Sequence, residues 1–457
     1  MSGKDSLENF FNPEKVVLLR SSAPMVEVGM SKPEVSGSVA ENLLKGGKDV
    51  VEADLSGEGW RDELSCIGEL SGALCVVATA GKALFSAMEM LIAKGVKDYI
   101  ILPGDFSTDE KRKLKALIEE RGIRVLGPNS IFGVIDTGTG MNTTFERGLE
   151  LPAGGSSFIF QSGGVGAAVI DQVLSCRIGV RRLAFLGNRY SLKEGDLLKE
   201  LVEDKGTFSI GIYTEGMNIR DVGLESLREL SRRKPITLLK GGKSEAGRRR
   251  AALHTDSLSK DEEVFSGVLR GLGCTVVDEV DLLALQTHFF SLNPGPPESD
   301  GVYIVSNVGG PAIELSDKLV ARGIRVPRLP EGLAERWMRV LKQIEPVNPV
   351  DLIADATPER YMKALDLLLE GRAQQALIII TALKSTLLGP SDVAEIISRL
   401  EKRDLKGRAV LIYIPGEEDY RRVLEATGDL PFFTHHSSRI ISDVLSNWHR
   451  RWRVLSQ

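Results

Sequence analysis

Short apolar runs alternate with amphipathic stretches along the whole chain. The runs at 16–19, 74–78 and 99–102 are continuous and apolar, whereas the stretches at 82–94 and 109–121 show helical spacing of apolar positions. Because a continuous apolar strand needs cover on both faces, this alternation predicts parallel sheets between layers of helices. Right-handed βαβ crossovers then give doubly wound α/β domains.

The pattern restarts twice, which predicts three domains. A second series of strands begins at 157–160 and a third at 302–306. Between them, the segment 293–299 is too rich in proline and glycine to form a helix or a central strand, so we interpret it as a linker. We therefore expect domains at residues 1–150, 151–292 and 300–457.

Composition and charge are those of an ordinary globular protein. The chain of 457 residues is 42% hydrophobic and 26% charged, and its net charge of -5 argues against a broad basic face for nucleic acid. No apolar stretch is long enough for a membrane span, and the N-terminus lacks the apolar core of a signal peptide. The four cysteines are scattered, so we expect neither disulfides nor a metal site. These features predict a cytoplasmic protein without nucleic-acid or membrane partners.

Two glycine-rich turns that join a strand to a helix are candidate anion sites. One is Ser162-Gly163-Gly164 and the other contains Gly309 and Gly310. In such turns, free backbone N–H groups and the positive end of the helix dipole hold an anion. Tight backbone geometry alone also explains glycine at a strand–helix turn, so each motif by itself is a weak signal. Together with a loop histidine, the two turns indicate one phosphate site approached by two helix ends.

The candidate reactive histidine is His254. It lies in a glycine- and hydroxyl-rich segment after the apolar run 235–239, where a side chain has little to pack against. Glu215, just past another strand, is placed to hold Nδ1–H of an imidazole and leave Nε2 free as a nucleophile. The alternative is that Glu215 is an ordinary exposed turn glutamate.

Several motifs, in their order and spacing, resemble those of the NDP-forming acyl-CoA synthetases, and particularly the α-subunit type of archaeal ADP-forming acetyl-CoA synthetase, a relative of succinyl-CoA synthetase. The motifs are Gln161-Ser162-Gly163, Gly187-Asn188, Thr214-Glu215-Gly216, Lys240–Gly247, His254-Thr255, Asn307–Pro311 and Asn348–Leu352. The resemblance implies a Rossmann-like CoA-binding domain followed by two flavodoxin-like domains of the succinyl-CoA-synthetase type.

The resemblance also implies an activity and a partner. Acyl-CoA, ADP and inorganic phosphate would become a carboxylic acid, coenzyme A and ATP through an acyl phosphate and a phosphohistidine. A separate ATP-grasp β subunit would hold ADP or ATP with Mg²⁺, in an α2β2 assembly. The implied roles are phosphoryl transfer by His254 with Glu215, phosphate binding by Ser162, Gly163, Gly164, Gly309 and Gly310, and CoA binding by Ser21, Ser22 and Asn129.

The chain departs from the family pattern at three positions. Arg20 has a side chain where the family has none, and it would either block the nucleotide part of CoA or pair with its phosphates. Asp105 adds negative charge near an anionic ligand, and Asp256 stands two residues from His254, where it would repel a phosphoryl group. A second hypothesis is therefore a non-catalytic or CoA-binding-impaired paralogue that acts as a binding or regulatory subunit.

Overall fold

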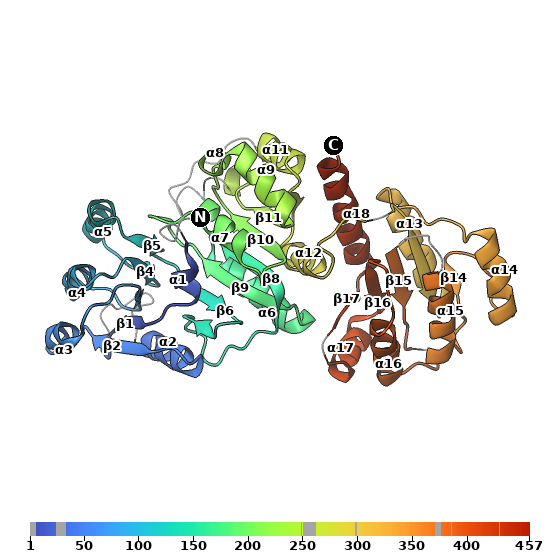
Figure 1. Ribbon diagram of the computed structural model, residues 1–457, viewed down its shortest axis with the longest axis horizontal. Coiled ribbons are helices and arrows are strands. Elements are labelled where there is room, and N and C mark those ends of the chain that lie inside the picture. Colours follow the sequence, from blue (N-terminus) through green and yellow to red (C-terminus); the bar gives the residue numbers. More distant parts are fainter. Residues whose placement is uncertain are drawn as a thin grey trace. The chain divides into compact units, whose positions relative to one another are not determined.

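The protein contains three sheets that follow one another along the chain (Figure 1). The computed structural model describes residues 6–23, 33–247, 249, 262–297, 299–370, 376–384, 386–428 and 430–457. Contacts divide the chain into two compact units, Met1–Thr287 and His288–Gln457. The first unit contains two of the sheets and the second unit contains the third.

All strands of the first sheet are parallel, in the order β2-β1-β3-β4-β5. The strands are β1 (Val16–Arg20), β2 (Val50–Asp54), β3 (Leu74–Val77), β4 (Asp98–Ile101) and β5 (Arg124–Leu126). The helices of this part are α1 (Glu8–Phe11), α2 (Pro33–Lys45), α3 (Trp60–Cys66), α4 (Lys82–Ala93) and α5 (Thr108–Arg121). Helix α5 begins with a capping box between Ser107 and Glu110 and ends at Gly122 in the left-handed conformation, as its sequence favours.

The second sheet has the order β12-β11-β10-β8-β9-β6-β7. Its strands are β6 (Val134–Asp136), β7 (Met141–Asn142), β8 (Ala153–Phe160), β9 (Val180–Phe185), β10 (Ser209–Thr214), β11 (Ile236–Lys240) and β12 (Thr275–Val277). Its helices are α6 (Gly163–Cys176), α7 (Glu194–Glu203), α8 (Ile219–Val222), α9 (Leu224–Arg233), α11 (Glu262–Gly271) and α12 (Val280–Leu292). Strands β6 and β7 are antiparallel additions at one edge, and they come from the range 1–150.

The third sheet is parallel, in the order β14-β13-β15-β16-β17. Its strands are β13 (Val302–Ser306), β14 (Val350–Asp351), β15 (Ala376–Ile380), β16 (Val410–Tyr413) and β17 (Phe433–His435). The helices are α13 (Gly309–Ala321), α14 (Glu331–Val340), α15 (Pro358–Glu370), α16 (Pro390–Glu401), α17 (Glu417–Ala426) and α18 (Ser438–Leu455).

Every sheet repeats one doubly wound topology, which confirms the predicted fold class. If the five parallel strands of each sheet are numbered along the chain, their spatial order is 2-1-3-4-5. The chain therefore leaves strand 1 toward one side and strand 3 toward the other, and their carboxyl ends frame a crevice where ligands bind in such folds. The framing pairs are β1 with β3, β8 with β10, and β13 with β15.

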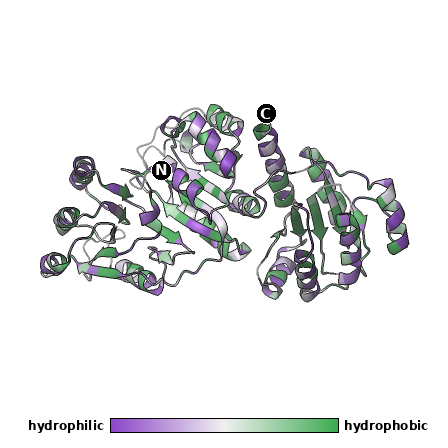
Figure 2. Ribbon diagram, viewed as in Figure 1, coloured by the Kyte–Doolittle hydropathy of each residue, from purple (hydrophilic) through white to green (hydrophobic). Residues whose placement is uncertain are grey.

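Hydrophobic strands form the centre of each sheet, and the helices around them carry polar residues as well (Figure 2). In the first unit one buried cluster includes Leu18 and Leu126 of the first sheet with Ile159 and Ala184 of the second. The first two sheets therefore share apolar core. Among the described helices, none is both long enough and apolar enough to cross a membrane.

A buried ion network also links α1 to the second sheet. Arg182 is 1% exposed, and its guanidinium lies 2.7 Å from the carboxylate of Asp136, which is fully buried. Glu8 of α1 accepts two hydrogen bonds from Arg182 Nη2, at 2.7 and 2.9 Å, and the guanidinium lies over the ring of Phe11. Arg181 Nη1 reaches the other oxygen of Asp136 at 2.5 Å. Asp136 is thus the shared counterion of two arginines.

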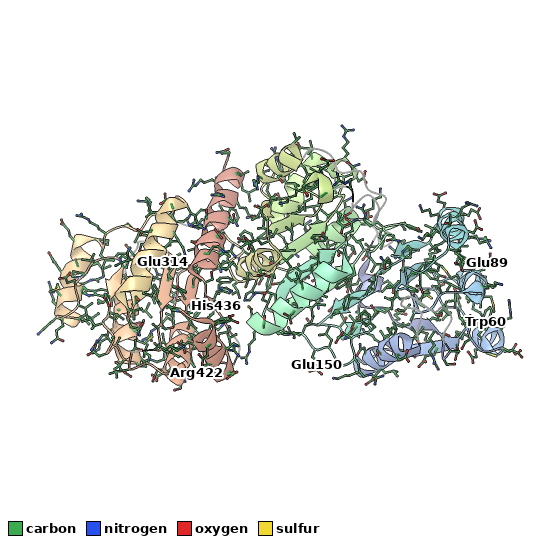
Figure 3. The ribbon with its side chains drawn as sticks, turned by 180° about the vertical axis from the view of Figure 1, so that it is seen from behind. Trp60, Glu89, Glu150, Glu314, Arg422 and His436 are labelled. Atoms are coloured by element: carbon green, nitrogen blue, oxygen red, sulfur yellow. The ribbon has the colours of Figure 1, made fainter. Side chains whose placement is uncertain are left out.

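Buried histidines predict that the second unit loses stability in acid. Burial lowers the pKa of His288 and of His449 to about 4, and burial with the nearby His436 and Arg439 lowers that of His435 to about 3. The ring of His436, labelled in Figure 3, stacks on that of His435 with centroids 4.5 Å apart. In the unfolded chain these groups regain the ordinary pKa of 6.5. The unfolded state therefore binds more protons, so stability is complete above pH 6.5 and falls as the pH decreases toward 4.

Between these pH values, the free energy of unfolding should fall by about 1.4 kcal/mol per pH unit for each histidine that stays neutral in the folded protein. Tryptophan fluorescence during denaturation measures this loss of stability. Trp337, Trp448 and Trp452 lie in the second unit, so in a Trp60→Phe background the fluorescence reports on that unit alone. A denaturation midpoint that does not change between pH 7 and pH 5 would contradict the expectation.

Candidate functional site

The residues after β8 and β10 meet at the crevice of the second sheet. The backbone N–H of Gln161 donates to the carbonyl of Tyr213 at 3.1 Å, and the N–H of Glu215 donates to Oε1 of Gln161 at 2.6 Å. The hydroxyl of Thr214 lies 3.1 Å from the same Oε1 and 2.7 Å from a carboxylate oxygen of Glu194. The Gln161 side chain therefore fixes the turn that carries Glu215 against the strand that leads to Ser162.

Glu215 is buried, at 8% exposure, which excludes the alternative of an exposed turn glutamate. The hydroxyl of Tyr213 donates to its Oε1 at 3.4 Å. Next to this pair, the N–H of Gly241 donates to the carbonyl of Thr214 at 2.9 Å. A Cβ at Gly241 would lie 2.4 Å from the Tyr213 hydroxyl and 3.3 Å from Cγ of Glu215, so only glycine fits. The strand end that leads toward His254 is thus packed on Glu215; His254 itself lies outside the described residues.

Helix α6 offers its N-terminus at the same edge of the sheet. Ser162 is its N-cap residue, and Oγ accepts a hydrogen bond from the N–H of Val165 at 3.4 Å. Gly164 is exposed, and a Cβ there would meet nothing closer than Ser162 Oγ at 4.0 Å. A Cβ at Gly163 would lie 3.0 Å from the side chain of Ile131. The first turn therefore has accessible N–H groups of the kind that bind anions.

The loop that carries Asn129 is packed against the second sheet. The N–H of Asn188, after β9, donates to the carbonyl of Pro128 at 2.8 Å, and Ser130 Oγ donates to the carbonyl of Phe185. Gly187 has φ +55°, and a Cβ there would lie 2.3 Å from the Pro128 carbonyl oxygen. Since Ile131 of this loop also lies against Gly163, the structure brings the predicted CoA residue Asn129 to the edge that holds the α6 N-terminus.

Ser21 and Ser22 are engaged within the first domain. Ser21 is buried, and its hydroxyl donates to the carbonyl of Ala23. The N–H of Ser22 donates to Oδ1 of Asp54 at 3.1 Å. Sequence reasoning missed Asp54, although an acidic residue at the end of a second strand is a known signal in dinucleotide-binding folds.

Gly309 and Gly310 begin α13 in the second unit. Asn307 exchanges two hydrogen bonds with the backbone of Ala382, at 2.8 and 3.0 Å, and so joins the turns after β13 and β15. A Cβ at Gly309 would lie 3.3 Å from a carboxylate oxygen of Asp351. The crevice of the third sheet thus contains the N-terminus of α13, beside turns that Asn307 holds together. The crevice of the second sheet likewise contains the N-terminus of α6, beside a turn that Gln161 fixes. Within the described ranges, no three His, Cys, Asp or Glu side chains are grouped to hold a metal ion.

Proteins named as subunits of ADP-forming acetate–CoA ligases are similar to this chain in length and in sequence. Residues 153–290 match the succinyl-CoA ligase like flavodoxin domain. The α subunit of ADP-forming acetate–CoA ligase II from Pyrococcus furiosus is 29% identical, over 92% of this chain and 93% of the relative. The α subunit of ligase I from the same organism is 28% identical, over 92% of each chain. This chain is therefore similar over nearly its whole length to α subunits of ADP-forming acetate–CoA ligases.

A solved structure is similar to this chain in its fold. The dinucleotide-forming acetyl-coenzyme A synthetase 1 of Ca. Korarchaeum cryptofilum, in complex with phosphate and ADP, superposes with a TM-score of 0.83. The superposition covers 99% of this chain and 98% of the other, at 23% sequence identity.

Proposed function

We propose that this chain is the α subunit of an ADP-forming acyl-CoA synthetase. Acyl-CoA, ADP and inorganic phosphate are converted to a carboxylic acid, coenzyme A and ATP. The observation that carries the proposal is the junction at the second crevice, where the buried Glu215, the N-cap Ser162 and the close-packed Gly241 lie together. Separate α subunits of ADP-forming acetate–CoA ligases that match over nearly their full length support it.

The chemistry consists of three transfers. First, an oxygen of inorganic phosphate attacks the thioester carbonyl, the C–S bond breaks, and the thiolate leaves and takes a proton. Second, Nε2 of His254 attacks the phosphorus of the acyl phosphate, and the P–O bond to the acyl group breaks with release of the carboxylate. Third, a β-phosphate oxygen of ADP attacks the phosphohistidine, the N–P bond breaks, and His254 is regenerated.

The protein's part is to bind and orient these groups. The N-terminus of α6, with Ser162, Gly163 and Gly164, would hold phosphate through its N–H groups and its dipole. Glu215 would accept Nδ1–H of His254 and fix the tautomer with Nε2 free. The α13 N-terminus, with Gly309 and Gly310, would supply the second phosphate position.

We assign the roles of the domains in the same way. Residues 1–150 would bind coenzyme A and residues 151–292 would contain the phosphohistidine. Residues 300–457 would present the N-terminus of α13. An ATP-grasp β subunit holding ADP or ATP with Mg²⁺ would complete the enzyme, as an α2β2 assembly in the cytoplasm. The relatives named as α subunits support the need for a partner.

Coenzyme A fits the first domain only in part. Asn129 lies at the edge shared with the α6 N-terminus, but the N–H of Ser22 already donates to Asp54, and Arg20 Nε is paired with Glu52 at 2.5 Å. The Ser22 amide is therefore not available for a phosphate of the nucleotide, and the charge of Arg20 is partly balanced by Glu52. None of the three transfers depends on the nucleotide part of the thioester.

Phosphoryl labelling tests the proposal. Incubation of the chain and its β subunit with γ-labelled ATP and Mg²⁺ should give an acid-labile, base-stable label on this chain. Addition of ADP should discharge the label. Absence of label in the presence of a β subunit that binds ATP would refute the proposed synthetase activity.

A Glu215→Gln variant should form the phosphohistidine more slowly. At metal sites, loss of a carboxylate that orients a histidine typically costs 10–100-fold, and we expect a decrease of about that size in the labelling rate here. Glu225→Gln is the matched control, because Glu225 is an exposed glutamate at the start of α9 in the same unit. The final stoichiometry of labelling should stay unchanged, since Glu215 positions the imidazole without accepting the phosphoryl group. Equal rates in the two variants would exclude the orienting role.

A further inference from the structure

The hydroxyl of Thr214, at the end of β10, organises the turn that carries Glu215. Thr214 is buried, and its Oγ accepts hydrogen bonds from the N–H of Gly216 at 3.2 Å and from the N–H of Met217 at 2.9 Å. Short-range hydrogen bonds of this kind, from the backbone to a threonine hydroxyl, stabilise a turn. The backbone on both sides of Glu215 is therefore held by one side chain.

The single proton of this hydroxyl has two acceptors within reach. Oε1 of Glu194 lies 2.7 Å from Thr214 Oγ, and Oε1 of Gln161 lies 3.1 Å from it. The proton belongs to the bond with Glu194, because that distance is shorter and a carboxylate is the stronger acceptor. Oε1 of Gln161 then remains for the N–H of Glu215, which donates to it at 2.6 Å. Glu194 thus acts through Thr214 on the hydrogen bonds that hold Glu215.

Glu194 is itself buried and has a cation beside it. Its side chain, at the start of α7, is 3% exposed, and Nη1 of Arg189 donates to its two carboxylate oxygens at 2.9 and 3.2 Å. The same Nη1 lies 3.2 Å from the carbonyl oxygen of Gly216, so Arg189 also binds the turn after Glu215. Because Arg189 balances the charge of Glu194, the buried carboxylate adds no net charge beneath this turn.

The loop that carries Arg189 is fixed on both sides of this residue. The N–H of Asn188 donates to the carbonyl of Pro128 at 2.8 Å, and the N–H of Tyr190 donates to the carbonyl of Gly127 at 3.2 Å. Arg189 itself has φ +55°, a left-handed conformation that is uncommon for a residue other than glycine. The guanidinium therefore extends from a backbone that is held in place, as a residue that positions its partners requires.

We propose that Thr214 and Glu194 are positioning residues for phosphoryl transfer, which act through the carboxylate of Glu215. The inference rests on the proposed function, in which Glu215 accepts Nδ1–H of His254. Thr214 and Glu194 make their contacts with the turn and with Arg189, so their effect on the transfer is indirect. Their role is to keep the Glu215 carboxylate in the one place from which it fixes the tautomer of the imidazole.

The initial rate of phosphohistidine formation from γ-labelled ATP, with Mg²⁺ and the β subunit, tests the inference. Thr214→Val keeps the shape of the side chain and removes its hydroxyl. We expect the rate at saturating ATP to fall about tenfold, the lower end of the effect of orienting residues at metal sites. The ATP concentration for half the maximal rate should not change, because ATP would bind on the β subunit. Thr214→Ser, which keeps the hydroxyl, should have a rate close to wild type, and Glu194→Gln should be slow like Thr214→Val.

Thr207→Val is the matched control. Thr207 is also a buried threonine, and its hydroxyl donates to Asp204 at 2.6 Å. It lies just before the start of β10, at the opposite end of this strand from Glu215. The control therefore loses a buried hydroxyl of the same sheet while the turn keeps its hydrogen bonds, and its labelling rate should equal that of wild type. Circular dichroism checks that each variant is folded.

A double mutant separates positioning from a general structural role. If Thr214 acts through Glu215, Thr214→Val should slow a Glu215→Gln protein much less than it slows wild type, because the effects of coupled residues do not add. Decreases that multiply in the double mutant would overturn the inference, and so would equal rates for Thr214→Val and Thr207→Val. Either result with a labelled wild type refutes this inference alone, whereas an unlabelled wild type refutes the proposed function.

Discussion

A His254→Ala protein should take up no phosphoryl label from ATP, although it should still bind its β subunit. The expected loss is complete, because the label is a covalent bond to an imidazole nitrogen and alanine has no nucleophile. Ser162 at the α6 N-terminus and the buried Glu215 would hold and orient the groups without accepting phosphate themselves. The measurement is acid-labile, base-stable radiolabel on the chain after incubation with γ-labelled ATP, Mg²⁺ and the β subunit.

Arg249→Ala is the matched control for this experiment. Arg249 is exposed in the same segment and pairs with Glu245 four residues earlier, so its loss changes the local charge without removing an imidazole. The control should be labelled as fully as wild type. Label that persists in His254→Ala would place the phosphoryl group on another residue, and the phosphohistidine assignment would fail.

An Asp136→Asn variant should strongly destabilise the first unit. Asp136 is fully buried and is shared by Arg181 and Arg182, and Arg182 is itself 1% exposed. Removal of one partner from a buried ion pair leaves an uncompensated charge and typically costs about 3–5 kcal/mol. Glu8, Glu200 and Asp204 still lie within 4 Å of the Arg182 guanidinium. We therefore expect a loss of stability at the lower end of this range, about 3 kcal/mol.

Hydrogen exchange of the β6 and β9 amides measures this loss where it occurs. Strand β6 pairs with β9 through Asp136 and Arg182 themselves, so faster opening should appear there first. Glu203→Gln is the control, because Glu203 pairs with Arg233 on the surface, with both side chains more than 40% exposed. Such a pair contributes less than about 1 kcal/mol. Equal protection in the two variants would show that the buried network adds no stability.

The fold could be predicted from the sequence because its signals are local. Continuous apolar runs became central parallel strands, and the stretches at 82–94 and 109–121 became α4 and α5 within one residue at each end. The edge strands β6 and β7 were not predicted. They are three and two residues long, respectively, and they form because β9 offers an unpaired edge.

The candidate site was predictable in part for the same reason. Ser162 could be predicted as an N-cap from the strand–turn–helix pattern around it. The burial of Glu215 could not be predicted, since it depends on Gln161, which is 54 positions away. The partner of Arg20 could not be predicted either, because the ion pair with Glu52 depends on the pairing of β1 with β2.

The sequence by itself determined three repeats of one α/β pattern, the two glycine-rich helix starts and the resemblance to the acyl-CoA synthetases. Only the tertiary structure decided that Gln161 fixes Glu215 and that Asp54 accepts a hydrogen bond from Ser22. The physical reason is distance along the chain. Hydrogen bonds between residues 32 or 54 positions apart form only after parallel strands have aligned their carboxyl ends at one edge.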